Sequence, residues 1–376
     1  MKVLFIQNVA SRFNTFAYSS YLAANDLGIE FHIASAWTGY RDDDAIRYDE
    51  NKYGIKIFQV DFVRTPYNLK NIRAYRQIVE IIEREKYDII HCNTPTGGLI
   101  GRLAGSKCNV SKIIYQAHGF HFYKGAPIKN WLIFYPIERL LAHLSDAIIT
   151  INQEDYIRAQ SFKLKNKGKI YIVPGVGIDT SIFTGSISNV DIKRKELNIP
   201  SNAKVLISIG ELNQNKNNIV IIDALKRIND SNIHYILCGK GPLEVKLKEK
   251  SMPIIDNVHF LGYREDINEL LHISDIFVLP SYREGLSRSL MEAMASNLPC
   301  IVSNIRGNND LITENYGGRL IKPNSVDGWS KAIFELANNS EMMKMYGQFN
   351  RKKVESFSLH NAVESIKEVY RSVIDK

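Results

Sequence analysis

Short apolar runs alternate with longer amphipathic stretches along most of the chain. The runs contain few polar residues, which is typical of strands buried on both faces of a parallel sheet. The stretches between them, such as "NIRAYRQIVEIIEREK" (71–86), have the apolar spacing of helices that cover such a sheet. In the first half of the chain, strands are expected at 2–7, 55–60, 87–93, 112–118, 146–152 and 169–174.

The same alternation starts again after a segment at 174–204 that is rich in Gly, Ser, Asn and Pro and is therefore a candidate linker. The pattern closes with an amphipathic helix at 357–376. In the second half, strands are expected at 204–212, 233–239, 258–263, 275–281, 299–304 and 318–323.

Two successive series of parallel strands predict an α/β protein with two Rossmann-like, doubly wound domains that face each other across a cleft. A chain of 376 residues is long enough for about two domains of the usual ~100–200 residues. Ligands of such sheets bind beyond the carboxyl ends of the strands. We place an N-terminal domain at 1–175 and a C-terminal domain at 176–356, with the helix at 357–376 packing back onto the first.

The positive charge of the chain is unevenly distributed. The net charge is +8, and residues 62–140 contain 12 Lys and Arg against 5 Asp and Glu, a local charge of +7. Such an excess favours an anionic partner or surface. No compact nucleic-acid-binding motif accompanies it, so nucleic acid is not the expected partner.

Cysteine usage and the lack of long apolar runs predict the compartment. Four cysteines without a CxxC pair indicate neither a disulfide framework nor a zinc site, and they fit a reducing cytoplasm. The strand-like "KVLFIQ" directly after Met1 is unlike a signal peptide, and no run of ~18 apolar residues could cross a membrane. We therefore expect a cytoplasmic protein.

The segment "EGLSRSLMEAMASNLPCIVS" (284–303) places two carboxylates beyond the strand expected at 275–281. Glu284 and Gly285 precede an expected helix, whose N-terminal N–H groups and dipole favour a phosphate. Glu292 follows among apolar neighbours, roughly 12 Å away at about 1.5 Å per helical residue. A nucleotide diphosphate sugar, with hydroxyls at both ends and a diphosphate between them, would satisfy both carboxylates.

Two further strand ends indicate the same ligand. The stretch "SIGELNQNKNN" turns at Gly210 and offers Lys216 to a developing diphosphate charge, and such positioned cations are a large electrostatic term in catalysis. The stretch "HFLGYREDI" puts Gly262 and Tyr263 where backbone groups could hold a nucleobase.

These residues resemble the retaining glycosyltransferases of family 4, whose two glutamates separated by seven residues are matched by Glu284 and Glu292. The resemblance covers most of the chain, is strongest over 204–325, and implies the GT-B fold. In that family the first glutamate contacts the donor sugar, the second contacts the ribose, and a lysine matched by Lys216 holds the diphosphate. With a UDP-sugar as the expected donor, the donor-binding residues are Gly210, Lys216, Gly262, Tyr263, Glu284, Gly285, Leu286, Ser287 and Glu292.

The chain departs from the family pattern at several positions. Glu211 stands where the family often carries an arginine, so the diphosphate would depend more on Lys216 and Arg288. The stretch "LSRS" replaces one in which proline is frequent, and "NVASRF" replaces a glycine pair after the first strand. The expected contacts of the second domain therefore follow from the resemblance more directly than those of the first.

In the first domain, two histidines end expected strands. His118 precedes Gly119, and the resemblance implies that a histidine at this position lies near the donor sugar and the reacting centre. His118 and Glu284 are accordingly the expected catalytic residues. His91 has two interpretations, a structural role or a role on the acceptor side.

The stretch that follows His118 mixes aromatic side chains with Lys124 and Lys129, which we assign to the acceptor side. Such a mixture suits a membrane interface or a lipid-linked acceptor, although helix packing would explain the aromatic residues equally well. The segment resembles family members that build bacterial capsule, exopolysaccharide or O-antigen units on a polyprenyl diphosphate carrier. We expect a retaining transferase that moves a hexose or N-acetylhexosamine from a UDP-sugar to such an acceptor, in peripheral contact with the anionic inner face of the cell membrane.

No metal or other cofactor is expected. The "DDD" at 42–44 formally contains the DxD pattern of metal-dependent glycosyltransferases, but its polar surroundings, away from any expected strand end, favour a solvated acidic turn. Configuration would be retained by front-face attack, in which the leaving phosphate oxygen accepts the proton of the acceptor hydroxyl.

Other classes of protein fit the residues less well. A glycoside hydrolase needs carboxyl groups about 5–5.5 Å apart for retention or about 6.5–9.5 Å for inversion, so the ~12 Å offset fits poorly and Lys216 would have no task. A sugar-nucleotide epimerase of similar architecture stays an alternative; it would need acid and base groups on both sides of the sugar ring and no acceptor surface. An oxidoreductase is disfavoured because the first strand lacks a GxGxxG turn. A non-catalytic binding protein would keep the same ligand contacts.

Overall fold

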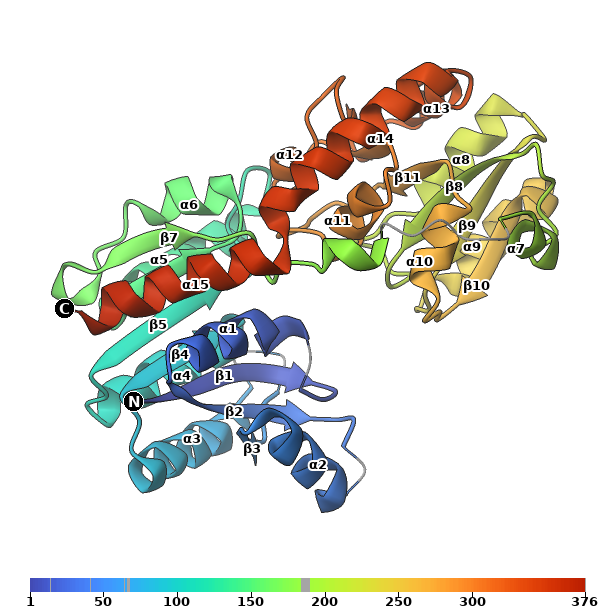
Figure 1. Ribbon diagram of the computed structural model, residues 1–376. Helices are drawn as coiled ribbons and strands as arrows, with labels where there is room; N and C mark the ends of the chain where they lie inside the picture. Colours follow the sequence, from blue (N-terminus) through green and yellow to red (C-terminus); the bar gives the residue numbers. More distant parts are fainter. Residues whose placement is uncertain (14, 41, 64, 66–67, 184–189, 376) are drawn as a thin grey trace. The chain divides into compact units, whose positions relative to one another are not determined.

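The chain forms two compact units. The computed structural model describes residues 1–13, 15–40, 42–63, 65, 68–183 and 190–375. One unit consists of Met1–Gly177 together with Leu359–Lys376, and the other of Ile178–Ser358 (Figure 1). The first unit is thus discontinuous in sequence, because the final helix belongs with the N-terminal residues.

The described part of the first unit contains a seven-stranded sheet in the order β3-β2-β1-β4-β5-β6-β7, and its neighbouring strands are parallel. The strand order reverses between β1 and β4, which is where open parallel sheets leave room for a ligand at their carboxyl edge. The strands are β1 (Lys2–Ala10), β2 (Glu30–Trp37), β3 (Lys56–Gln59), β4 (Ile89–Asn93), β5 (Lys112–Ala117), β6 (Ala147–Thr150) and β7 (Lys169–Ile172).

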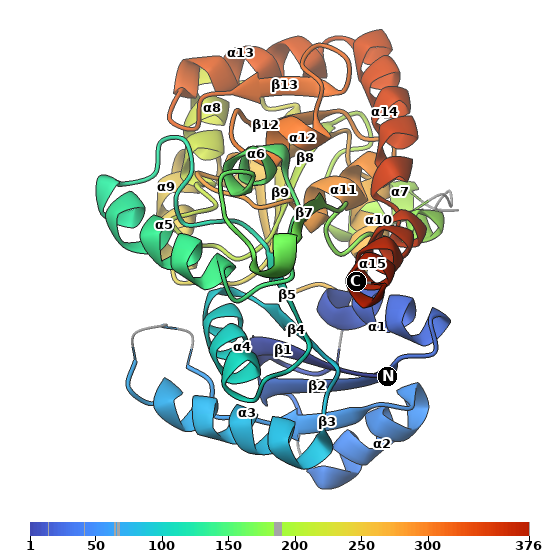
Figure 2. The same cartoon turned by 90° about the vertical axis from the view of Figure 1, so that its left-hand side faces the viewer.

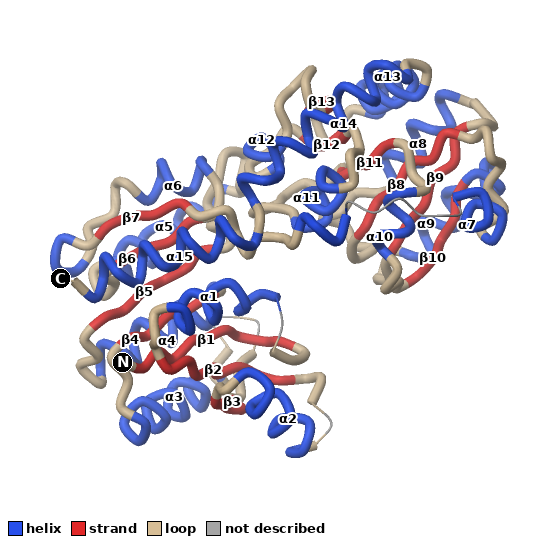
Figure 3. Tube along the Cα trace, in the orientation of Figure 1, coloured by secondary structure: helices blue, strands red, loops and turns tan. Residues whose placement is uncertain are grey.

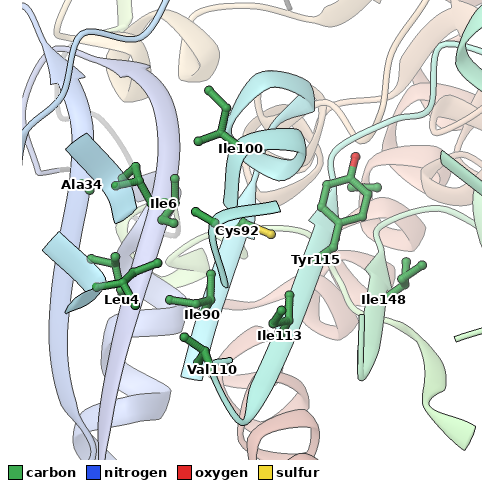
Figure 4. Close-up of a cluster of buried hydrophobic side chains, with 14 of the residues drawn as sticks. Leu4, Ile6, Ala34, Ile90, Cys92, Ile100, Val110, Ile113, Tyr115 and Ile148 are labelled. Atoms are coloured by element: carbon green, nitrogen blue, oxygen red, sulfur yellow. The ribbon is translucent and has the colours of Figure 1, made fainter. Parts of the chain in front are cut away.

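Helices cover both faces of this first sheet (Figure 2). Leu4 and Ile6 of β1 belong to a core shared with α3 and α4, and Figure 4 shows both in the same cluster as Ile100 of α4. On the other face, His91 of β4 reaches Tyr370 of α15, which packs against α1. The helices are α1 (Thr15–Asp26), α2 (Asp43–Tyr53), α3 (Asn71–Glu85), α4 (Pro95–Lys107), α5 (Ile128–Ala142), α6 (Gln153–Ala159) and α15 (Leu359–Ile374), with a short 3₁₀ turn at Lys165–Lys167.

Small residues let α4 lie against the sheet at close range. A Cβ atom on Gly98 would stand 2.3 Å from Tyr115 Cε2, and one on Gly101 would stand 2.5 Å from Cys92 Cβ. The glycines in "TGGLIGRLAG" are therefore a packing requirement, since larger side chains would push the helix away from β4 and β5.

The described part of the second unit contains a six-stranded sheet in the order β10-β9-β8-β11-β12-β13, again with parallel neighbours (Figure 3). The order reverses between β8 and β11, so the loops after these two strands meet at one edge. The strands are β8 (Lys204–Ile209), β9 (Ile233–Cys238), β10 (Val258–Gly262), β11 (Ile276–Leu279), β12 (Cys300–Ser303) and β13 (Gly318–Ile321).

Alternate residues of β8 enter two different cores. Val205 and Ile207 pack with α10 and α11, whereas Leu206 packs with α8 and α13. A strand that is apolar on both faces is thereby buried on both faces, as its uninterrupted apolar run predicts. The helices are α7 (Val190–Glu196), α8 (Ile219–Ile228), α9 (Glu244–Ser251), α10 (Ile267–His272), α11 (Arg288–Ala295), α12 (Asn308–Leu311), α13 (Val326–Ala337) and α14 (Ser340–Val354), with 3₁₀ turns at Thr180–Phe183, Met252–Asn257 and Glu355–Phe357.

The structure contains one strand that the sequence pattern did not predict. β2 (Glu30–Trp37) has the sequence "EFHIASAW", in which histidine and serine interrupt the apolar run. His32 is nevertheless buried, because its two ring nitrogens lie against Tyr87 and Glu30. The candidate linker contains the helix α7, and its residues 184–189 lie outside the described part of the chain.

Candidate functional site

An ion pair lies at the carboxyl edge of the second sheet. The chain turns at Gly210 after β8, and Lys216 then stands in the loop that leads to α8. Its Nζ lies 2.7 Å from Oε1 of Glu284, which follows β11, and both side chains are mostly buried. Two residues from separate strand ends are therefore in direct contact.

Hydrogen bonds from backbone N–H groups and asparagine side chains hold the two loops of this ion pair together. The N–H of Tyr282 donates to the carbonyl of Asn215 over 2.8 Å, and the Asn215 amide donates back to the carbonyl of Arg283 over 3.0 Å. Asn217 adds a bond to the carbonyl of Pro280 at 3.2 Å. The positions of Lys216 and its partner are thus fixed by the loops themselves.

Glycines allow the backbone segments of this edge to approach one another. A Cβ atom on Gly239 would stand 1.9 Å from the Gly210 carbonyl oxygen, and one on Gly307 would stand 2.2 Å from the Gly285 carbonyl oxygen. Gly210, Gly239 and Gly307 also have positive φ angles of 148°, 145° and 79°, which side-chain-bearing residues rarely adopt. This edge is therefore built from closely packed backbone segments.

The second glutamate of the predicted pair lies on α11. This helix begins at Arg288, two residues later than expected, and Ser287 caps it by accepting a hydrogen bond from the N–H of Leu290 at 3.4 Å. Gly285 and Leu286 therefore belong to the turn that precedes the helix. Nε of Arg288 lies 2.8 Å from Oε1 of Glu292.

The environment of Glu292 affects the pKa of its carboxyl group in two opposite directions. Burial against the apolar side of α11 raises the pKa of the Glu292 carboxyl, and the neighbouring guanidinium of Arg288 acts in the opposite direction. Each glutamate of the predicted pair thus has its own cation. Such neutralised carboxylates can accept hydrogen bonds from sugar hydroxyls without an exposed negative charge repelling a diphosphate.

Gly262 and Tyr263 lie at the end of β10, on the same edge. Gly262 has a φ of 65°, and its carbonyl accepts a 2.7 Å hydrogen bond from the N–H of Gly239. The side chain of Tyr263 is 73% exposed. This hydrogen bond joins the ends of β9 and β10. The exposed side chain of Tyr263 could therefore contact a partner.

In the first unit, His118 follows β5 and is half-buried. Its Nε2 is hydrogen-bonded to Oδ1 of Asn93 at the end of β4, and its ring lies 4.1 Å from that of Phe16, centroid to centroid. Burial, with a smaller contribution from His91, lowers the pKa of His118 to about 3. The imidazole is therefore neutral at physiological pH.

His91 had two interpretations, a structural role and a role on the acceptor side, and its contacts fit the structural role. Its side chain has no exposed surface, and its ring nitrogens are hydrogen-bonded to the Tyr370 hydroxyl at 2.9 Å and to Gln116 Oε1 at 3.1 Å. Burial lowers the pKa of His91 to about 3. His91 thereby joins β4 to the C-terminal helix α15, and no ring nitrogen is left for a substrate.

Lys124 and Lys129 are both exposed. Lys124 precedes α5, where its backbone N–H donates to Glu154 Oε1 over 2.6 Å, and Lys129 lies in the first turn of α5.

Asp42, the first residue of the acidic stretch at 42–44, caps α2 by accepting a hydrogen bond from the N–H of Ala45 at 2.9 Å. Across the described ranges, no group of three or more His, Cys, Asp or Glu side chains is arranged to hold a metal ion.

Two residues of these sites were missed by the sequence analysis. Arg306 is buried and its Nε lies 3.3 Å from the backbone carbonyl of Glu284, so it supports the same loop. Asn93 contacts His118 although 25 residues separate them. Neither residue has a spacing that would have revealed it, because each contact joins the ends of different strands.

The chain matches two protein-family models and several named proteins. "Glycosyl transferases group 1" matches residues 189–353, and "Glycosyl transferase 4-like" matches residues 2–152. EpsD of Bacillus subtilis (strain 168), which is named as a glycosyltransferase, is 32% identical over 382 residues, covering 100% of this chain and 97% of that protein. The UDP-Gal:alpha-D-GlcNAc-diphosphoundecaprenol alpha-1,3-galactosyltransferase of Escherichia coli is 29% identical over 313 residues, covering 81% of each.

Solved structures share the fold of this chain. Anabaena HepE, crystallised in complex with UDP and glucose, superposes with a TM-score of 0.80 at 18% identity, covering 99% of this chain and 100% of that one. Sucrose-phosphate synthase from Thermosynechococcus elongatus gives a TM-score of 0.78 at 16% identity, covering 100% and 99%. The two parallel sheets therefore confirm the predicted GT-B fold class.

Proposed function

Because the chain belongs to the glycosyltransferases, we propose that it transfers a hexose or N-acetylhexosamine from a UDP-sugar to a saccharide carried on polyprenyl diphosphate. The product would be an intermediate of a bacterial surface polysaccharide such as capsule, exopolysaccharide or O-antigen. The relatives support this reading, since the E. coli relative is named for a GlcNAc-diphosphoundecaprenol acceptor and a UDP-galactose donor.

The contact between Lys216 and Glu284 is the observation that carries the proposal. The ammonium group of Lys216 suits the diphosphate of the donor, and the carboxylate of Glu284 suits hydroxyls of its sugar. Because Nζ and Oε1 are only 2.7 Å apart, the bond between sugar and diphosphate would lie beside this pair. That bond is the one that breaks during transfer.

The remaining donor contacts follow from the same edge of the second sheet. Glu292 would accept hydrogen bonds from the ribose hydroxyls, with Arg288 limiting the free energy lost by burying its charge. The backbone around Gly262 and Tyr263 would hold the base. The turn at Gly285 and Leu286, just before α11, would bring N–H groups and the positive end of the helix dipole to the phosphates.

We propose that transfer retains configuration by front-face attack. The acceptor hydroxyl would form its bond to the anomeric carbon on the face from which UDP departs, and a phosphate oxygen of UDP would take the hydroxyl proton. Lys216 would stabilise the charge that develops on the diphosphate. The imidazole of His118 would hydrogen-bond the reacting sugar as a neutral group, and no metal ion would take part.

The acceptor side is proposed to approach a membrane surface through α5. Ile128, Leu132 and Leu140 of this helix are 78%, 72% and 71% exposed, and the exposed Lys124 and Lys129 lie before the helix and in its first turn. An exposed apolar face with adjacent cations suits an interface with anionic lipids. In the described part of the chain, no helix is both long enough and apolar enough to span a bilayer.

A transfer assay with isolated membranes tests the proposed function. Purified protein would be incubated with radiolabelled UDP-sugars and with membranes that contain polyprenyl-diphosphate-linked saccharides, and the lipid phase would be extracted. We expect label in the lipid phase for one UDP-sugar, released as sugar by mild acid. Interconversion of the free UDP-sugar without labelled lipid would instead favour the epimerase alternative.

A further inference from the structure

Three polar side chains gather at the carboxyl edge of the first sheet. The pairing of β1 with β4 ends at Ile6 and Cys92, so Gln7 and Asn93 each follow the last paired residue. The first turn of α4 approaches β1 closely here, because a Cβ atom on Gly97 would stand 3.2 Å from Gln7 Cα and 3.0 Å from Thr94 Oγ1. His118, just beyond the next strand, is the third member.

The amide groups of this cluster are buried and partly unpaired. Asn93 has no exposed surface, and its Oδ1 accepts a hydrogen bond from His118, yet its Nδ2 has no partner within the described residues. Gln7 is 3% exposed, and its Nε2 also lacks a partner there. A buried donor left unpaired costs about 1–3 kcal/mol. Two such donors on neighbouring strands indicate a place for an oxygen atom of a ligand.

The contact with Asn93 also determines which nitrogen of His118 carries the proton. An amide oxygen can only accept a hydrogen bond, so Nε2 of His118 must be the donor. Because the imidazole is neutral, its Nδ1 is then an acceptor. Within the described ranges, Nδ1 of His118 makes no hydrogen bond of its own.

We propose that Asn93 is a positioning residue that holds His118 in the Nε2–H tautomer, and that Asn93, Gln7 and His118 together form a subsite for sugar hydroxyls. The amides of Asn93 and Gln7 would donate hydrogen bonds to hydroxyl oxygens, and Nδ1 of His118 would accept a hydrogen bond from a hydroxyl group. Only the identification of the ligand as a sugar rests on the proposed function.

The chemistry of the cluster favours a neutral polyol over a phosphate. None of the three side chains is charged, whereas phosphate sites in proteins are typically lined by cations or helix N-termini. A sugar presents neighbouring hydroxyls that each donate and accept, which matches two donors and one acceptor. The sugar could be that of the donor or that of the acceptor, and kinetics can separate the two.

Substitutions of similar volume test the subsite. Gln7→Met removes the donor while keeping the length of the side chain, and Asn93→Leu removes both functions of that amide. Gln77→Met is the matched control, because its amide is fully paired with Asp61 at 2.9 and 3.1 Å on α3. Gln7→Met and Asn93→Leu should lower kcat/KM for transfer about 10- to 100-fold, with less than a twofold change for the control.

The pattern of the kinetic loss identifies the sugar. A loss confined to the KM of the lipid-linked acceptor assigns the subsite to the acceptor, and an equal loss in UDP-sugar hydrolysis without acceptor assigns it to the donor. If both variants match the Gln77→Met control in both assays, the subsite does not exist.

Nitrogen NMR of His118 tests the positioning role without any need for activity. In protein labelled with ¹⁵N at histidine, the parent should show the His118 signals of an Nε2–H tautomer, and Asn93→Leu should populate both tautomers. An Nδ1–H tautomer in the parent, or spectra unchanged by Asn93→Leu, would overturn the assignment.

The same spectra separate failure of the subsite from failure of the proposed function. In uniformly labelled protein, addition of methyl glycosides should shift the side-chain amide signals of Gln7 and Asn93 but not that of Gln77. Shifted amide signals in a protein that transfers no sugar to the lipid-linked acceptor would support the subsite and overturn the proposed function. Amide signals that stay unchanged would refute the sugar subsite.

Discussion

Lys216 and Glu284 are 68 residues apart in sequence, yet Nζ of one lies 2.7 Å from Oε1 of the other. The pair exists because β8 and β11 are neighbours at the point where the strand order of the second sheet reverses. Each residue stands in the loop after its strand, so the topology of the sheet brings a cation and a carboxylate together. We propose that this contact lies at the centre of a donor site.

Removal of the cation should weaken the binding of UDP. In Lys216→Ala the diphosphate loses a charge-assisted hydrogen bond, and Glu284 is left as an unpaired carboxylate beside it. We expect Kd for UDP to rise about 10- to 100-fold in titration calorimetry. Lys331→Ala is the control, since its exposed ion pair with Asp327 lies on α13; equal affinities in the two variants would remove Lys216 from the phosphate site.

Replacement of Glu284 should abolish transfer and leave the protein folded. Glu284→Gln keeps the shape of the side chain but loses the charge that pairs with Lys216 and accepts sugar hydroxyls. A fall in kcat of at least about 100-fold is expected, because such contacts tighten in the transition state. Circular dichroism should match that of the parent, and Glu244→Gln, which pairs with Lys248 at the surface, should retain full activity. Parental turnover by Glu284→Gln contradicts its role.

The pH dependence of nucleotide binding should reveal the protonation of Glu292. Burial raises the pKa of this carboxyl, so Glu292 takes up its proton at a higher pH than an ordinary glutamate as the solution is acidified. A protonated Glu292 accepts ribose hydroxyls less well, so UDP affinity should fall on acidification. Because Arg288 lowers the pKa of Glu292, Arg288→Ala should move that fall to higher pH in calorimetric titrations. An unchanged pH profile would show that Glu292 does not contact the ligand.

The fold should lose stability in mild acid. Burial lowers the pKa of His91 to about 3 and that of His259, stacked on His234, to about 4. In the unfolded chain these groups titrate near pH 6.5, so the unfolded state binds more protons and stability falls as pH decreases below about 6.5. We expect Tm to decrease steadily between pH 7 and pH 4.5, and to decrease less in His259→Asn. A Tm that rises over this range would contradict the neutral, buried imidazoles.

Transfer should continue when metal ions are removed. The proposed mechanism places only Lys216, backbone N–H groups and the α11 terminus at the diphosphate, so none of its steps depends on a divalent cation. Activity in excess EDTA should equal that in Mg²⁺ within about twofold, as the charge-stabilising groups belong to the protein. A complete loss of activity that is reversed by Mn²⁺ or Mg²⁺ would make the acidic residues at 42–44 candidate metal ligands.

The sequence predicted most of the strands and the turns at their ends because both depend on local pattern. Uninterrupted apolar runs identified the strands that are buried on both faces, and Gly210 and Gly262 marked turns at strand ends. β2 escaped prediction because its buried His32 is satisfied by Tyr87, a partner 55 residues away. The start of α11 was misplaced by two residues because Ser287, and not a residue before it, caps the helix.

Contacts between strand ends could not be predicted from the spacing of residues in the sequence. Arg306 supports the Glu284 loop, Asn93 holds His118, and His91 reaches Tyr370 across 279 residues. Each contact is set by the order of strands in a sheet or by the return of α15 to the first unit. A histidine at the end of a strand has the same sequence pattern whether it faces a ligand or a buried tyrosine. The contacts of His91 could therefore be found only from the structure.

A crystal structure with an intact UDP-sugar, or with a non-hydrolysable analogue, tests the central claim most directly. We expect the diphosphate within hydrogen-bond distance of Lys216 Nζ, sugar hydroxyls on Glu284, and ribose hydroxyls on Glu292. A donor bound away from the β8 and β11 loops, with the Lys216–Glu284 pair undisturbed, would contradict it.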